Sequence, residues 1–153
     1  MKTLIIYDSV YGNTAVAAKA VASVLGENKI VRSVAEARTD SLVDIDRLII
    51  ATPTHGGRAS EAIQAYIKSL PDTSLVNKRA AVFSTGINSQ GKNMALRLLL
   101  KILGYAAAPT LALLLKKGAL IAGEPLDLIV KGKQGPLLDG ELDRAITWAK
   151  NLK

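Results

Sequence analysis

Short runs of apolar and β-branched residues recur along the chain, each bounded by polar or turn-forming residues. Runs of this length that do not alternate with polar residues are typical of strands buried on both faces of a sheet. The pattern predicts strands at Thr3–Tyr7, Lys29–Val34, Arg47–Ala51 and Ala80–Ser84. A fifth strand is expected to be broken by a loop, with parts near Leu111–Leu115 and Leu126–Lys131.

Apolar residues at helical spacing fill most of the segments between these runs. Helices are expected at Thr14–Leu25, Ser60–Leu70, Lys92–Leu103 and Asp139–Leu152, with at most a short helix within Glu36–Asp46. Ser60 is the predicted N-cap of the second helix, and Gly26 the predicted C-cap of the first. The third helix is expected to bury Met94, Ala95, Leu98, Leu99 and Ile102.

Apolar strands that alternate with helices indicate an α/β fold, in which helices cover both faces of a parallel sheet. We expect one domain spanning residues 1–153. Sheets of this kind bind ligands beyond the carboxyl ends of their strands, where the strand order reverses. The loops that follow Tyr7, Ala51 and Ser84 are therefore the expected location of a site.

The first of these loops joins a strand to a helix N-terminus. Unpaired N–H groups and the positive end of the helix dipole stabilise a phosphate there without a lysine. Ser9, Asn13 and Thr14 offer further donors, and Gly12 lets the backbone approach a ligand closely. The loop is neither a Walker loop nor a dinucleotide fingerprint, and an ordinary N-cap and tight turn would have the same sequence.

The second and third loops offer surfaces for a flat heterocycle. Thr52–Arg58 contains adjacent glycines and His55, which is the only histidine of the chain. Adjacent glycines permit backbone geometries closed to other residues, so a planar ring can pack against bare peptide groups. Ser84–Gly91 supplies hydroxyls, amides and peptide groups but no carboxylate, and so no general acid or base.

Composition and charge exclude several other classes. The 153 residues include no cysteine, which excludes disulfides and thiolate chemistry. The apolar stretch Ile102–Leu115 is shorter than the roughly 20 residues of a membrane-spanning helix, and Leu4–Tyr7 is too short for a secretory signal. We therefore expect no membrane span and a cytoplasmic location. The net charge of +7 is scattered, and aromatic residues make up only 4%, so we expect no specific nucleic-acid partner.

Together the three loops resemble those of flavodoxin-like FMN proteins, and among these the WrbA-type quinone reductases most. The resemblance runs from Met1 to the last helix. The similar motifs are the phosphate loop Ser9-Val10-Tyr11-Gly12-Asn13-Thr14, the loop Thr52-Pro53-Thr54-His55-Gly56, and the segment Ser84-Thr85-Gly86 through Gly91. Gly135-Pro136-Leu137 and Gly140-Glu141-Leu142 are similar to the final segment of many such domains.

The resemblance implies a three-layer sandwich around a five-stranded parallel sheet of order 2-1-3-4-5, with FMN as the cofactor. It implies that the phosphate is held by Ser9, Tyr11, Gly12, Asn13 and Thr14. It implies that the ring is lined by Thr54, His55 and Gly56, and its pyrimidine side and ribityl chain by Thr85, Gly86 and Ile87. Further implied contacts are Val10, Pro53, Gly57, Ser84 and Gly91. We also hypothesise that a peptide within His55–Gly57 reorients to accept a hydrogen bond from reduced flavin.

The expected function is electron transfer through a non-covalently bound FMN, by a one-electron carrier or a small quinone-type reductase. No catalytic side chain and no metal site is assigned. The basic charge favours an acidic redox partner protein, whereas a reductase would act on a quinone-like substrate. Two alternatives stay open: a flavodoxin-fold binding or regulatory module that does not hold flavin, and a nucleic-acid-binding protein suggested by the charge alone.

Overall fold

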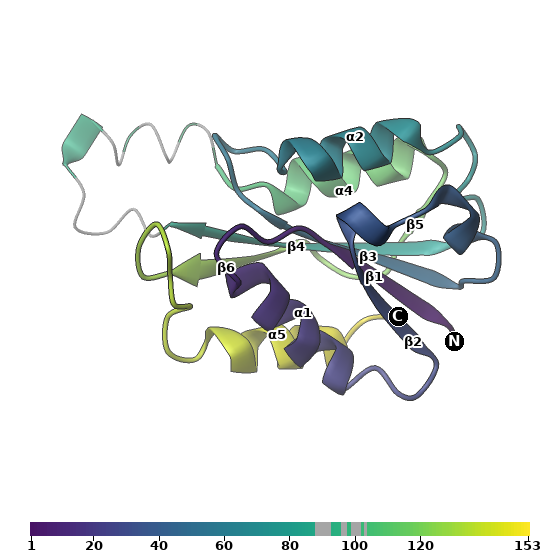
Figure 1. The fold of residues 1–153 in the computed structure, drawn as a ribbon, viewed down its shortest axis with the longest axis horizontal. Helices are drawn as coiled ribbons and strands as arrows, with labels where there is room; N and C mark the ends of the chain where they lie inside the picture. The colour runs from purple at the N-terminus through teal and green to yellow at the C-terminus, as the bar shows by residue number, and fades with distance from the viewer. Residues whose placement is uncertain (88–92, 96–97, 99–101, 103) are drawn as a thin grey trace.

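A parallel sheet forms the middle of the molecule (Figure 1). The structure, a computed structural model, describes residues 1–87, 93–95, 98, 102 and 104–153. The path through the sheet is β2 (Lys29–Ser33), β1 (Thr3–Tyr7), β3 (Arg47–Pro53), β4 (Arg79–Ile87) and β5 (Leu120–Ile121), and β6 (Leu126–Val130) also pairs with β4. The expected order 2-1-3-4-5 is confirmed.

The fifth strand is interrupted, as the sequence predicts, but its first part lies elsewhere. β5 pairs with the beginning of β4 and β6 with its end, so the two pieces continue one another along the same neighbour. The expected strand at Leu111–Leu115 is wrong, because these residues lie inside helix α4 (Ala107–Lys116). Leucine and alanine are strong helix formers, and a short apolar run does not by itself distinguish a buried helix from a strand. Pro109 lies in the first turn of α4, where proline is tolerated.

Two pairs of helices cover the two faces of the sheet. α2 (Glu61–Ser69) and α4 lie on one face, and α1 (Asn13–Ser23) and α5 (Glu141–Lys150) lie on the other (Figure 1). Successive strand residues point to opposite faces, so each strand contributes to both cores. Leu4, Ile6, Leu48 and Ile50 pack in the α2 and α4 layer, and Ile5, Ile49 and Phe83 in the α1 and α5 layer. All of these side chains are fully buried.

Local signals place most helix ends. The Ser60 side chain accepts the Ile63 N–H at 3.4 Å and starts α2, as the sequence predicts. The expected C-cap at Gly26 is wrong, because α1 ends at Ser23 and Val24 caps it. The weak helix expected after the second strand is two short 3₁₀ turns, Val34–Glu36 and Thr39–Leu42.

The helix expected at Lys92–Leu103 falls largely outside the described residues. Leu99 is among those that the structure does not describe. Met94, Ala95, Leu98 and Ile102 are described, and all four are exposed, so the expectation that they are buried is wrong. The layer beside α2 is formed by α4 instead, which leaves these side chains without a sheet face to cover. No helix among the described residues is long and apolar enough to cross a bilayer.

Candidate functional site

The carboxyl ends of β1, β3, β4 and β6 surround a cavity of about 410 Å³. Eleven of the expected cofactor contacts line it: Ser9, Val10, Tyr11, Asn13, Thr14, Pro53, Thr54, His55, Thr85, Gly86 and Ile87. Its volume is within the range of small-molecule and cofactor sites. Residues from three separate loops, predicted separately from the sequence, are therefore brought to one cavity.

The loop after β1 presents the head of α1 to this cavity. Gly12 is the N-cap, with a φ of 91°, and its carbonyl accepts the Val16 N–H at 3.0 Å. The N–H groups in the first turn of a helix have no acceptor within the helix, which applies here to Asn13 and Thr14. The Ala15 N–H is donated to Ser9 Oγ at 3.2 Å, which leaves the Ser9 hydroxyl hydrogen to be donated elsewhere.

The Asn13 side chain joins the first loop to the last. Its Nδ2 donates to the Gln134 carbonyl at 3.0 Å, in the connection between β6 and α5. Gly135 follows with a φ of 92°, and a Cβ placed on it would collide with the Asn13 side-chain amide. The amide therefore fixes the last loop against the first, while Asn13 still lines the cavity.

The loop after β3 closes as a tight hairpin turn. His55 N–H donates to the Arg58 carbonyl at 2.9 Å, and Arg58 N–H donates to the His55 carbonyl at 3.1 Å. Gly56 and Gly57 between them have φ of 57° and 77°. Two central residues with positive φ are the pattern of a type I′ turn, which glycine adopts without steric cost. The two adjacent glycines thus adopt a backbone geometry closed to most other residues, as the sequence predicts.

A chain of hydrogen bonds joins the three loops behind the cavity. Thr14 Oγ1 and Thr85 Oγ1 lie 2.8 Å apart, and the Thr85 carbonyl accepts the Thr54 N–H at 2.7 Å. Thr54 Oγ1 donates to Ser84 Oγ at 3.1 Å, and Ser84 in turn donates to Asp127 Oδ1 at 2.5 Å. Because each loop is bonded to the next, the cavity is held together before any ligand enters.

Tyr105 supports the third loop from outside the cavity. Its hydroxyl donates to the Ile87 carbonyl at 3.3 Å, and its ring lies where a Cβ on Gly86 would be, 2.6 Å from the nearest ring atoms. Partial burial raises the pKa of Tyr105, and the nearby charges of Asp127 and Glu141 raise it further. The phenol therefore stays protonated and keeps donating its hydrogen bond above the ordinary range of a tyrosine.

The remaining expected contacts contribute in other ways. Gly12 caps α1, Gly56 and Gly57 form the turn, and Ser84 belongs to the hydrogen-bonded chain, while Gly91 lies outside the described residues. Two lining residues, Val130 and Lys133, were missed. A signal for them existed, because they end and follow the predicted fifth strand, whose carboxyl end lies at the same edge of the sheet.

Comparison with known proteins decides the family. Residues 4–119 match the family model described as a flavodoxin domain. The chain belongs to the flavodoxin family. The resemblance expected from the loop motifs is thus confirmed, and it places this flavodoxin-family chain among flavin-binding electron-transfer proteins.

Solved structures of this family have the same fold. One flavodoxin from the domain Archaea has a TM-score of 0.76 and 17% identity, covering 97% of this chain and 94% of its own. A Streptococcus pneumoniae TIGR4 flavodoxin has a TM-score of 0.74 and 18% identity, covering 99% and 97%. A flavodoxin, WrbA-like protein from Agrobacterium tumefaciens has a TM-score of 0.68 and 17% identity, covering 97% and 95%. Among curated proteins, none matches this chain.

The chemistry of the cavity fits FMN. Its lining combines the N–H groups at the head of α1 with threonine and serine hydroxyls, and the described lining residues include Lys133 but no carboxylate. Such a donor set stabilises a phosphate, and none of these lining side chains carries a negative charge that would repel it. The glycine turn of the second loop and the end of β4 supply exposed peptide groups for a planar ring.

Proposed function

We propose that this flavodoxin-family chain holds FMN without a covalent bond and carries electrons one at a time between proteins. One observation carries the proposal: N–H groups at the head of α1, without an acceptor within the helix, open onto a cavity whose described lining includes no carboxylate. A phosphate dianion is stabilised at such a helix N-terminus. The flavin supplies the redox chemistry when bound, and the protein supplies position and electrostatics.

The proposed roles of the residues follow their elements. The backbone N–H groups of Asn13 and Thr14, with the Ser9 hydroxyl, hold the phosphate. The turn His55–Arg58 lies along the ring, and Thr85–Ile87 bind its polar edge with their peptide groups. Tyr11 and His55, both exposed beside the cavity, are the aromatic side chains available to cover the ring.

A carrier is favoured over a substrate-transforming enzyme by the side chains that line the cavity. Among the described residues that line the cavity, the titratable groups are Tyr11, His55 and Lys133, and no hydrogen-bonded acid–base pair is found among these three. A small quinone-type reductase is the second candidate, because exposed Tyr11 and His55 offer flat surfaces on which a quinone would stack. The net charge of +7 favours an acidic protein partner, and we propose a cytoplasmic, single-domain protein.

The test compares FMN with riboflavin, which lacks the phosphate. We expect FMN to bind at micromolar or lower concentration and about a hundredfold more tightly than riboflavin, as charge-assisted phosphate contacts require. Flavin fluorescence quenching measures both affinities. Equal affinities would refute the phosphate site, and no binding of either flavin would favour the flavin-free binding module.

Reductive titration then separates the two redox roles. With the FMN-loaded protein under anaerobic conditions, a carrier takes up dithionite electrons in two resolved one-electron steps. A quinone-type reductase passes directly to the two-electron-reduced state. Absorption spectra recorded during the titration distinguish the outcomes, and a single two-electron step would overturn the proposed carrier function.

A further inference from the structure

A groove runs along the outer face of the α2 and α4 layer, on the side of the sheet opposite α1 and α5. It is hollowed into two adjoining cavities of about 490 Å³ and 260 Å³, which share Gln64 and Leu113. Ala65, Ile67 and Pro109 give it apolar walls. The groove is lined by both helices and is separate from the flavin cavity, with which it shares no lining residue.

The groove is positively charged. Lys68, Lys116 and Lys117 line the larger cavity and Arg58 the smaller one, against Asp72 as the single carboxylate of the lining. Lys68 and Lys116 are exposed, and neither forms an ion pair within the part of the chain that the structure describes. Their charge is therefore available to a partner.

The net charge of the chain arises from one stretch of the sequence that includes α4. Residues 73–123 contain seven lysines and arginines and no aspartate or glutamate, so they account for the whole net charge of +7. This stretch includes β4, α4 and β5. The remainder of the chain is balanced, and the α1 and α5 layer carries Glu141 and Asp143 beside its cations. Of these seven cations, Lys116 and Lys117 line the groove, and Lys78 and Arg79 lie where β4 begins.

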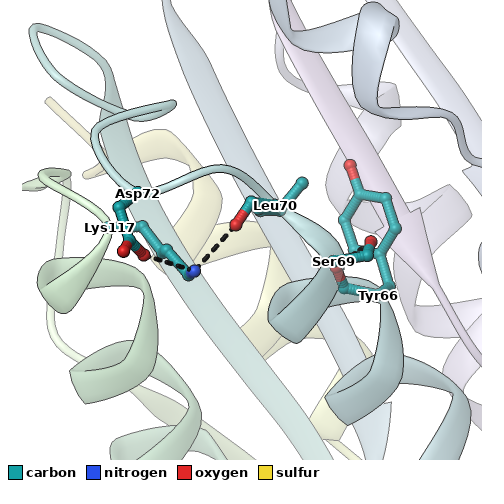
Figure 2. A network of polar contacts seen from close by, with 5 residues as sticks. All are labelled: Tyr66, Ser69, Leu70, Asp72 and Lys117. Carbon is teal, nitrogen blue, oxygen red and sulfur yellow. Dashed lines mark hydrogen bonds and ion pairs between the residues drawn. The ribbon is translucent and has the colours of Figure 1, made fainter.

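The far end of the groove is held in a fixed shape by Lys117. Its Nζ donates to the Leu70 carbonyl at 2.7 Å and to Asp72 Oδ1 at 2.8 Å, which ties the end of α4 to the end of α2 (Figure 2). The hydrogen bond from Lys117, and its charge, hold the pKa of Asp72 below its usual value. A groove whose walls are already joined loses little conformational entropy when a partner binds.

The near end of the groove adjoins the flavin cavity. His55 lines the flavin cavity and Arg58 lines the groove, and these two residues are the paired ends of one hairpin turn. A protein seated in the groove would therefore reach the turn that borders the proposed flavin. An electron-transfer partner must bring its redox centre close to the flavin, and a partner bound in the groove would lie beside it.

We propose that the α2–α4 groove is the docking site of an acidic redox partner, which inserts an amphipathic acidic helix between the two helices. The inference rests on the proposed carrier function. Apolar walls with lysines at their edges complement a helix that has leucine-like residues on one face and carboxylates beside them. A nucleic acid is disfavoured, because the groove offers apolar walls rather than aromatic stacking platforms.

The test measures binding of a synthetic amphipathic helical peptide of leucine and glutamate to the full chain, with and without FMN. We expect the NMR shift changes to lie on α2 and α4 in both forms, and the affinity to fall about tenfold between ~20 and ~150 mM NaCl. Lys68→Glu combined with Lys116→Glu should weaken binding at least about tenfold. Lys19→Glu combined with Lys150→Glu, which makes the same charge change on exposed positions of the other layer, should change it less than about twofold.

Several outcomes would overturn the docking site. They are equal effects of the two variant pairs, shift changes confined to α1 and α5, or tighter binding of a mixed-sequence DNA duplex with the same sensitivity to Lys68 and Lys116. Because the peptide is also tested without FMN, its binding would survive a failure of the flavin proposal. Conversely, FMN binding without peptide binding would refute the groove alone.

Discussion

Gly135 offers the sharpest test of how the last loop supports the cavity. It has a φ of 92°, and a Cβ added to it would collide with the Asn13 side-chain amide, which itself donates to the Gln134 carbonyl. Gly132, three residues earlier in the same connection, has no such φ and open space where a Cβ would stand. Gly135→Ala therefore meets both obstacles, and Gly132→Ala, in the same connection, meets neither.

The expected cost of Gly135→Ala has two parts. Holding a non-glycine residue in a left-handed conformation costs roughly 1–2 kcal/mol. Forcing a methyl group against a packed side chain costs about 1–3 kcal/mol. The sum, roughly 2–5 kcal/mol, corresponds to a fall in melting temperature of about 6–15 °C for a chain of this size. Gly132→Ala should stay within about 0.5 kcal/mol of the parent.

Thermal and urea unfolding of the flavin-free chain measure these costs. Asn13→Ala removes the atoms with which the new methyl group collides, so the double variant should recover about 1–2 kcal/mol relative to additivity. Because Asn13 is the first residue of α1, Gly135→Ala should also weaken FMN binding more than riboflavin binding. Equal stability of Gly135→Ala and Gly132→Ala, or strict additivity with Asn13→Ala, would refute the reasoning.

Three further predictions concern single positions. Flipping the Gly56–Gly57 peptide converts a type I′ turn into a type II′ turn, in which only the first glycine needs a positive φ. Gly57→Ala should therefore favour the flipped turn, which is the one expected with reduced flavin, and raise the potential of the first flavin reduction. Gly56→Ala alters the glycine that the flipped turn still needs, so it should lower that potential. Identical shifts would refute a peptide reorientation. Burial raises the pKa of Tyr66 to about 12, so its folded pKa exceeds the unfolded value of 10.0 and stability falls as the pH rises through this window. Tyr66→Phe, which removes a buried hydroxyl without a partner among the described residues, should lose that part of the pH dependence and be at least as stable at neutral pH; a less stable variant would count against it. Gly86→Ala should destabilise the chain by about 1–3 kcal/mol through its clash with Tyr105, and additivity with Tyr105→Leu would contradict that cause.

Much of the fold could be predicted because its signals are local. β1 begins and ends where the apolar run Thr3–Tyr7 does, and Ser60 caps α2 through its own side chain. The errors arose where local pattern is ambiguous. Leu111–Leu115 has no polar residue to reveal its periodicity, and it became helix because α4 covers the sheet beside α2.

The sequence by itself determined which loops form the candidate site, since each motif follows directly after an apolar strand and parallel strands end at one edge. Only the tertiary structure decided which residues distant in sequence contact these loops. Asn13 bonds to Gln134, Ser84 to Asp127, and Lys133 joins the lining, all across long separations in sequence. The α2–α4 groove likewise exists only once two helices pack side by side. Such contacts depend on packing between elements, which neither spacing nor residue preference encodes locally.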